Sequence, residues 1–280
     1  MDDLEKILAR VKAESPLTLA ITNQVTIGDC ANALLAIGAA PVMSDDPDDA
    51  RDLAALASAT VLNIGTVGPA QLEVLLAAGR GARAAGRPVV LDPVGAGATA
   101  TRRTAAESLL REVRPDIIRG NLSEIKALAG LEGVQRGVDS TAGDDLSAVA
   151  ALAGELAGRL SAVVAVTGAT DVVATTGRTT TGRTTAGRTW FIGGGSPLLT
   201  RLTGTGCLLS AMVGAYAGAA GGDLALATAG ALAHLALAGQ RAAENLGQAP
   251  LLGTFKIRLF DNLALVSPED LGRSGLAECS

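Results

Sequence analysis

The sequence predicts an α/β fold with a mostly parallel central sheet and helices packed on both faces. Short apolar runs, typical of buried strands, alternate with longer stretches that are rich in Ala and Leu at helical spacing. Because a helix separates each strand from the next, neighbouring strands are expected to run parallel. No Pro- or Ser-rich linker divides the chain, so residues 1–280 are expected to form a single domain.

The expected strands end in polar or glycine-bearing tips. They are predicted at residues 17–23, 60–66, 88–98, 116–121 and 162–168. Helices are predicted between them, at residues 31–39, 49–59, 68–86, 102–113 and 145–160. In a parallel sheet, the loops at the carboxyl ends of the strands can converge on a ligand, whereas the packed faces cannot. We therefore expect the functional residues at these tips.

The second part of the chain differs in composition and pattern from the first. Residues 171–192 contain an imperfect repeat, TTGR-TTTGR-TTAGR, whose Thr and Gly content favours a hairpin with a long tip over a helix. From Leu202 the pattern returns to helix through His234. The uncharged run 202–222 is long enough for a membrane span, but its Ala- and Gly-rich composition favours a buried helix.

Composition excludes several classes of protein. A net charge of −5, with 48% hydrophobic and 2% aromatic residues, argues against disorder and against nucleic acid or an anionic membrane as the main partner. His234 is the only histidine, which excludes multi-histidine zinc sites. Three cysteines without a C-x-x-C pair, and an amino terminus without a signal-peptide apolar region, favour a reducing compartment, the cytoplasm.

The familiar nucleotide-binding signatures are missing. No lysine follows a glycine, so the chain has no G-x-x-x-x-G-K-[ST] phosphate loop. Neither GTGCLL (204–209) nor GAGATA (95–100) completes the G-x-G-x-x-G pattern of a dinucleotide-binding fold. P-loop NTPases and Rossmann enzymes are therefore disfavoured.

Two glycine-rich loops remain as candidates. At the start of a long apolar helix, the amides of Gly204, Thr205, Gly206 and Cys207 are placed to form an anion hole. The alternative is a connector whose helix is capped by Thr205. In the other loop, Asp92 ends a strand before Pro93, as a ligand-binding carboxylate or as a turn-forming residue.

The segment IIRGNLSEI (117–125) combines a cap with charged residues. Asn121 and Glu124 fit a helix N-cap and its capping-box partner. Arg119 and Glu124, within reach of Asp92 on a neighbouring strand, would also suit a phosphate and a hydrated Mg²⁺. The cap and the metal role can coexist.

Several motifs in fixed order carry a resemblance to a known family. They are ITNQVTIGDCANALLAIGAAPVMSDDPDDA (21–50), VLNIGT (61–66), PVVLDPVGAGAT (88–99), IIRGNLSEI (117–125), GVDS (137–140), VVAVTGATDVV (163–173), PLLTRLTGTGCLLSAMVGAY (197–216) and GTFKIRLFDNL (253–263). In this order the chain resembles the hydroxyethylthiazole kinase family. The resemblance implies a ribokinase-like fold, phosphorylation of 4-methyl-5-(2-hydroxyethyl)thiazole by ATP with Mg²⁺ in thiamine salvage, and a homotrimer with active sites between subunits.

The resemblance also implies roles for individual residues. Met43 and Gly204 are similar to the family's substrate contacts, and Asn23 lies at the substrate end. Arg119 and Thr167 are similar to its ATP contacts, with Asn121 beside them. Asp92 and Glu124 would lie near Mg²⁺ and the phosphates.

Cys207 stands where ribokinase-like kinases generally carry an aspartate base, although cysteine is usual in this family. We expect the helix N-terminus to lower the pKa of its thiol, so Cys207 is either a proton acceptor or a packing residue. The repeat at 175–189 departs from the family's ordinary hairpin, which leaves the nucleotide-side lid undefined.

Three rival functions remain open. One is a kinase of hydroxymethylpyrimidine or pyridoxal type, against which the segments ITN and PVM count. Another is an ADP/ATP-dependent NAD(P)H-hydrate dehydratase, which would need a pocket for a dinucleotide. The third is a catalytically silent binding protein, which would lack Asp92, Glu124 or TGTG, and the chain has all three.

Overall fold

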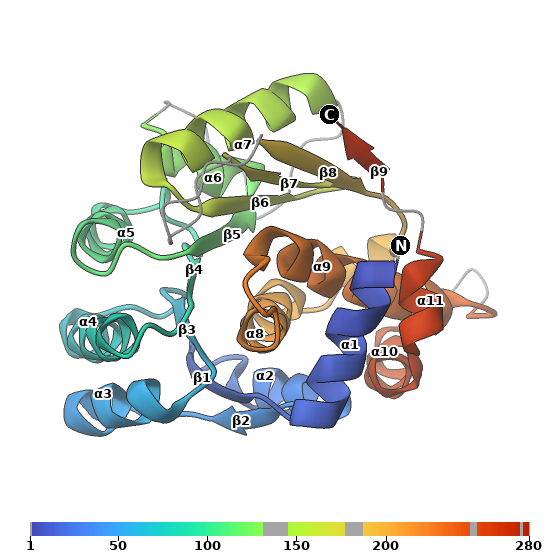
Figure 1. Ribbon diagram of the computed structural model, residues 1–280, viewed down its shortest axis with the longest axis horizontal. Helices are drawn as coiled ribbons and strands as arrows, with labels where there is room; N and C mark the ends of the chain where they lie inside the picture. The colour runs from blue at the N-terminus through green and yellow to red at the C-terminus, as the bar shows by residue number, and fades with distance from the viewer. Residues whose placement is uncertain (1, 131–144, 177–186, 247–250, 275–276, 280) are drawn as a thin grey trace.

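The computed structural model describes residues 2–130, 145–176, 187–246, 251–274 and 277–279. Within them, a nine-stranded sheet in the order β2-β1-β3-β4-β5-β6-β7-β8-β9 lies between two layers of helices (Figure 1). The parallel part contains β1 (Leu17–Ile21), β2 (Ala40–Val42), β3 (Ala59–Asn63), β4 (Val89–Asp92), β5 (Ile117–Asn121) and β6 (Val163–Thr167). The predicted α/β class and all five predicted strands are confirmed.

The antiparallel end of the sheet confirms the predicted hairpin. Its strands are β7 (Asp171–Thr175), β8 (Arg188–Ile192) and β9 (Ala277–Cys279). The tip of the repeat, residues 177–186, and the GVDS motif at 137–140 lie outside the described residues. Two strands were not expected: β2 is short and contains Pro41, which an edge strand tolerates, and β9 is equally short.

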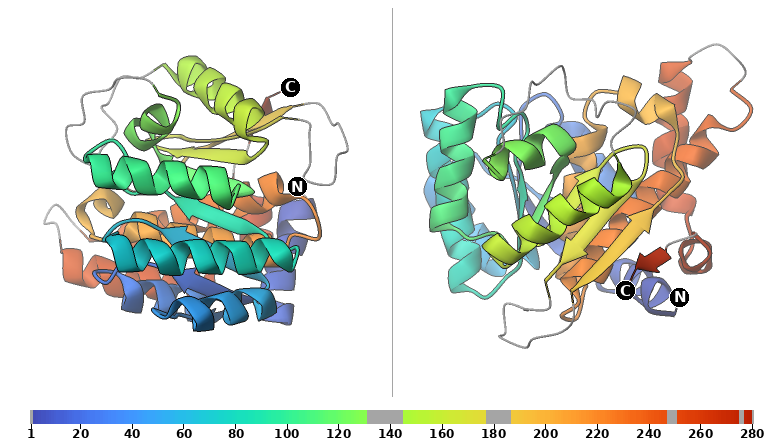
Figure 2. Two further views of the ribbon diagram at one scale, coloured as in Figure 1. Left: turned by 90° about the vertical axis from the view of Figure 1, so that its left-hand side faces the viewer. Right: turned by 90° about the horizontal axis from the view of Figure 1, so that it is seen from above.

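The helices divide between the two faces of the sheet (Figures 1 and 2). One face is covered by α1 (Asp2–Glu14), α2 (Ile27–Ala36), α8 (Thr205–Gly218), α9 (Leu224–Ala243), α10 (Leu252–Leu265) and α11 (Pro268–Gly272). The other is covered by α3 (Pro47–Leu56), α4 (Pro69–Ala84), α5 (Ala100–Glu112), α6 (Leu122–Leu128) and α7 (Leu146–Leu160). Successive side chains of one strand enter the cores on opposite faces of the sheet. In β3, Val61 packs toward α8 and Leu62 packs toward α4.

Helix α8 approaches the sheet unusually closely. A Cβ on Gly214 would collide with Cγ2 of Val61, so only glycine fits there. The residues from Leu208 to Ala217 are buried all round the helix, which confirms the buried helix expected for this run. In the part of the chain that the structure describes, no helix combines the length and the apolar composition that a membrane crossing requires.

A buried polar chain joins α8, α9 and α10. The hydroxyl of Tyr216 lies 2.7 Å from Nδ1 of His234, and Nε2 of His234 lies 2.9 Å from the carbonyl oxygen of Leu263. Because a carbonyl oxygen can only accept, Nε2 carries the proton and Nδ1 accepts from Tyr216. Burial, which is complete here, lowers the pKa of His234 to about 4 and keeps the ring neutral.

This histidine makes the stability depend on pH. In the unfolded chain a histidine titrates near its ordinary pKa of about 6.5, so the unfolded state binds the proton first as pH falls. Stability from neutral His234 is present above that value and lost down to about pH 4, a fall of about 3 kcal/mol in unfolding free energy. We expect His234→Gln, which cannot titrate, to lack this component in urea unfolding measured across the range. Parallel pH profiles for both proteins would contradict this.

Candidate active site

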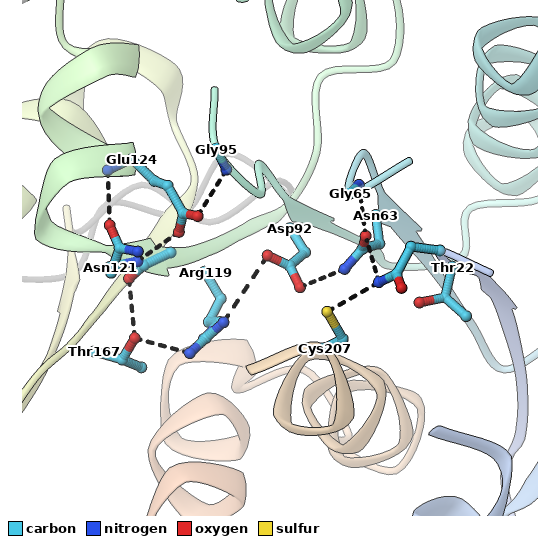
Figure 3. Close-up of polar contacts among 12 residues, drawn as sticks. Thr22, Asn63, Gly65, Asp92, Gly95, Arg119, Asn121, Glu124, Thr167 and Cys207 are labelled. Carbon is cyan, nitrogen blue, oxygen red and sulfur yellow. Dashed lines mark hydrogen bonds and ion pairs between the residues drawn. The ribbon is translucent and has the colours of Figure 1, made fainter. Parts of the chain in front are cut away.

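Polar side chains gather where the strands under α8 approach their carboxyl ends (Figure 3). They are Asn63, Asp92, Arg119 and Thr167. Two residues earlier on each strand stand core residues of the α8 face, namely Val61, Val90, Ile117 and Ala165. Because strand side chains repeat every second residue, the four polar groups continue this face beyond the core and point toward the start of α8.

Asp92 lies at the centre of the group and is completely buried. Its Oδ2 accepts a hydrogen bond of 2.7 Å from Nδ2 of Asn63, and its Oδ1 lies 3.9 Å from Nη1 of Arg119. Among the described residues, Oδ1 has no hydrogen-bond partner. Burial raises the pKa of Asp92 above its usual range, against the opposing effect of the Arg119 cation.

Arg119 reaches from β5 to the start of α8. Its Nη2 donates a hydrogen bond of 2.8 Å to Oγ1 of Thr167, which places this cation between Thr167 and Asp92. A Cβ on Gly206 would lie 2.9 Å from Nη1, so glycine at this position lets the first turn of the helix approach the guanidinium. The structure thus brings together two residues that the sequence predicted as ATP contacts.

The start of α8 is open to a ligand. Gly204 occupies the N-cap position with φ +93°, and no side chain caps the helix within the described residues. The Thr205 hydroxyl instead donates back to the carbonyl oxygen of Leu199 at 3.0 Å, so the alternative of a helix capped by Thr205 is wrong. First-turn amides without a side-chain cap, beside a buried arginine, form an environment suited to an anion.

Asn121 and Glu124 form the predicted capping box. Oδ1 of Asn121 accepts from the Glu124 amide at 2.9 Å, and Oε2 of Glu124 accepts from the Asn121 amide at 2.8 Å. The other oxygen of Glu124 accepts from the Gly95 amide at 2.8 Å. Burial and then the negative charge of Asp92 raise the pKa of Glu124 to about 7. The cap therefore holds a carboxyl group whose ionisation depends on its neighbours.

A chain of amides leads from Asp92 to Cys207. Oδ1 of Asn63 accepts from the Gly65 amide at 2.8 Å and from Nδ2 of Asn23 at 3.3 Å. Nδ2 of Asn23 also donates to Sγ of Cys207 at 3.1 Å. Asn63 was not among the predicted site residues, although the register with Asp92 on the next strand could have indicated it.

The expected low pKa of Cys207 is wrong. Burial, followed by the negative charge of Asp92, raises the pKa of the thiol above its ordinary value. Side-chain hydrogen bonds with Asn63 and Thr26 and the positive charge of Arg119 act in the opposite direction without reversing the shift. The surroundings of Cys207 therefore disfavour its thiolate form.

Two more residues complete the survey. Met43 follows the edge strand β2 and packs against the core beneath α8; among the described residues, none of the hydrogen bonds of the amide chain reaches it. Asp171, which the sequence analysis did not single out, accepts from the Gly168 amide at 2.9 Å and so holds the turn after Thr167. Burial raises its pKa to about 6.

Solved structures of known proteins match the fold of this chain. The solved structure of a hydroxyethylthiazole kinase protein from Pyrococcus horikoshii superposes with a TM-score of 0.86 at 34% identity, covering 100% of both chains. A ribokinase-like superfamily protein from Enterococcus faecalis shares the fold, with a TM-score of 0.62, 13% identity, and 94% and 95% of the two chains covered.

Relatives found by sequence carry the same family name as the matching solved structure from Pyrococcus horikoshii. A hydroxyethylthiazole kinase of Methanoculleus marisnigri is 45% identical over 95% of this chain and 89% of its own length. One of Leptothrix cholodnii is 46% identical over 94% of this chain and 91% of its own. The model of the hydroxyethylthiazole kinase family matches residues 8–269, and the chain, with its ribokinase-like fold, belongs to that family of kinases.

Proposed function

We propose that this chain transfers the γ-phosphoryl group of ATP to the hydroxyl of 4-methyl-5-(2-hydroxyethyl)thiazole in thiamine biosynthesis. Family membership supports the reaction. The observation that carries it is the uncapped start of α8 facing the buried Arg119–Asp92 pair. Such a site stabilises a phosphoryl group by amides and one cation, the form of catalysis on which phosphoryl transfer mainly depends.

The carboxylates of the site fit the Mg²⁺ that the family implies. Asp92 offers a buried oxygen without a hydrogen-bond partner, and the pKa of nearby Glu124 is raised partly by the charge of Asp92. A divalent cation would relieve that repulsion, and when bound it neutralises charge on the phosphates. Within the described residues no cluster of three His, Cys, Asp or Glu side chains could hold a metal, so phosphate and water would complete its coordination.

The remaining residues would bind and orient the reactants. Arg119 and Thr167, with Asn121 beside them, would hold the phosphates of ATP. The amides of Gly204, Thr205, Gly206 and Cys207 would receive the transferring group. Asn23, Met43 and Gly204 would place the alcohol. The raised pKa of Cys207 disfavours the thiolate that a general base would require, and a loose transition state tolerates the loss of such a base.

The rival functions are separated by their substrates. ATP consumption measured with the thiazole alcohol, hydroxymethylpyrimidine and pyridoxal in parallel should be fastest with the thiazole. The same preparation should not dehydrate hydrated NADH in the presence of ATP or ADP. Preference for another alcohol would change the substrate assignment, and dehydratase activity alone would overturn the kinase proposal.

We also propose a cytoplasmic homotrimer of single-domain subunits of residues 1–280, with active sites between subunits. Apolar side chains lie exposed around Asn23 and along α2, with Val25 70%, Ile27 43% and Leu35 59% accessible. Surfaces of this kind mark contacts with other chains. This face also lies near Met43, which a neighbouring subunit would then place at the site.

Light scattering should give a mass of about three times the 27.8 kDa of one chain. Val25→Glu should weaken the assembly and lower activity, because it buries a charge in an apolar contact. Leu56→Glu is the matched control, since Leu56 on α3 is equally exposed, at 71%, on the opposite face. A fully active monomer would remove the shared site.

Arg119→Ala should raise the KM for ATP by about one to two decades, the usual effect of losing a charge-assisted contact. Arg83→Ala is the control, because Arg83 pairs with the buried carboxylate of Asp116 at the amino ends of β4 and β5, away from the site. Steady-state kinetics at varied ATP would decide. An unchanged KM in a folded Arg119→Ala protein would exclude this arginine from the nucleotide site.

Substitutions at Cys207 separate proton transfer from positioning. If the amides of α8 carry the catalysis, Cys207→Ala should lower kcat about tenfold or less, while Gly204→Val should abolish it, because a Cβ there would lie 2.5 Å from Cγ2 of Thr26. A fall of about 10²–10⁴ would show instead that the thiol is the base. A Cys207→Asp protein faster than the wild type would show that proton removal limits the rate.

A further inference from the structure

Arg102 crosses the carboxyl edge of the sheet between two loops. It stands in the first turn of α5, where its amide donates to the Thr99 cap, and its side chain is half-buried. Nη2 donates a hydrogen bond of 2.7 Å to the carbonyl oxygen of Gly65, in the loop after β3. The guanidinium also lies on Gly95, in the loop after β4, where a Cβ would collide with Nη1.

Each of these two glycines holds a polar group of the site. The Gly65 amide donates to Oδ1 of Asn63, whose Nδ2 fixes Asp92. The Gly95 amide donates to Oε1 of Glu124. Figure 3 shows both amides above the polar cluster, one at each side of Asp92. The positions of these two amides therefore decide how both carboxyl groups are held. Arg102 contacts neither amide directly but the neighbouring backbone, at the carbonyl oxygen of Gly65 and beside Cα of Gly95.

The local geometry shows that the contact is specific. Gly95 adopts φ +63°, a conformation that L side chains rarely take, and the flat guanidinium occupies the space that a side chain would fill. Within the described part of the chain, Arg102 makes no ion pair with a carboxylate, so a contact to a backbone carbonyl is its polar anchor. A planar group with several donors can hold a carbonyl while stacking on a Cα, which an ammonium cannot.

We propose that Arg102 is a positioning residue that braces the loops after β3 and β4, and through their glycine amides orients Asp92 and Glu124. Arg102 itself touches neither carboxyl group. Its removal loosens both loops at Gly65 and Gly95, and the carboxyl groups lose their fixed direction. Small misplacements of catalytic groups cost up to about 100-fold in rate.

The test compares Arg102→Ala with Arg103→Ala. Arg103 is the next residue of the same helix and is exposed, which makes it a matched control for charge and helix propensity. Hydrogen–deuterium exchange should become faster in peptides covering residues 64–68 and 94–98 of Arg102→Ala, and should stay at the wild-type rate in Arg103→Ala. This measurement does not require catalytic activity.

The kinetic part of the test rests on the proposed function. With the thiazole alcohol and ATP, Arg102→Ala should lose about 10- to 100-fold in kcat with little change in the KM of the alcohol. Millimolar guanidinium chloride should restore part of the lost rate, and Arg102→Lys should not, because the planar group carries the contact. A merely stabilising arginine would not respond to guanidinium in this way.

The outcomes distinguish a failure of the Arg102 proposal from a failure of the proposed kinase function. Unchanged exchange in Arg102→Ala would overturn the brace. Faster exchange with wild-type kcat would overturn its role in positioning. If the wild-type protein phosphorylates no alcohol, the proposed function fails, while hydrogen exchange still decides whether Arg102 holds the two loops.

Discussion

The close packing of α8 on β3 is the contact on which the site depends. Gly214 removes the side chain that would keep the helix away from Val61, so the helix axis lies directly over the parallel strands. Its first turn then meets the edge at which those strands end, and Gly206 lets it approach Arg119. A bulkier residue at either position would separate the helix amides from the polar side chains that continue the same face. Packing in the core thus sets the geometry of the site.

The site places two buried carboxyl groups beside one arginine. Asp92 and Glu124 are buried together, and the arginine beside them, Arg119, is shared with Thr167. Burial raises the pKa of both carboxyl groups, so their surroundings disfavour the charged forms. A metal–nucleotide complex would supply a cation for the carboxylates and an anion for Arg119 and α8. Under the proposed function, the reactants would therefore complete the charge balance of these polar groups.

The local sequence pattern predicted the fold and most of the residues at the strand ends. Buried strands and helices differ in the period of their apolar residues, and the polar residue that ends an apolar run marks the end of the strand. It did not predict Asn63 or Arg102. Asn63 acts on Asp92, 29 positions away, by a side-chain hydrogen bond, and Arg102 acts on Gly65, 37 positions away, through a backbone carbonyl that carries no sequence signature. The prediction of a lowered pKa for Cys207 was wrong for a similar reason. The helix N-terminus can be recognised in the sequence, but the depth at which the thiol is buried cannot. Strands β2 and β9 are too short for a pattern to emerge.

The orientation of Asn23 defines what Cys207 can do. Oδ1 of Asn23 accepts from the amides of Val25 and Thr26, both at 3.1 Å, and from the Thr26 hydroxyl at 3.0 Å. A flipped amide would place its NH₂ group against those donors, so Nδ2 must face Cys207 and Asn63. The sulfur therefore accepts a hydrogen bond from Asn23, which fixes it in the first turn of α8. Because burial also raises the pKa of this thiol, its surroundings hold the sulfur in place and disfavour the thiolate that a base would require.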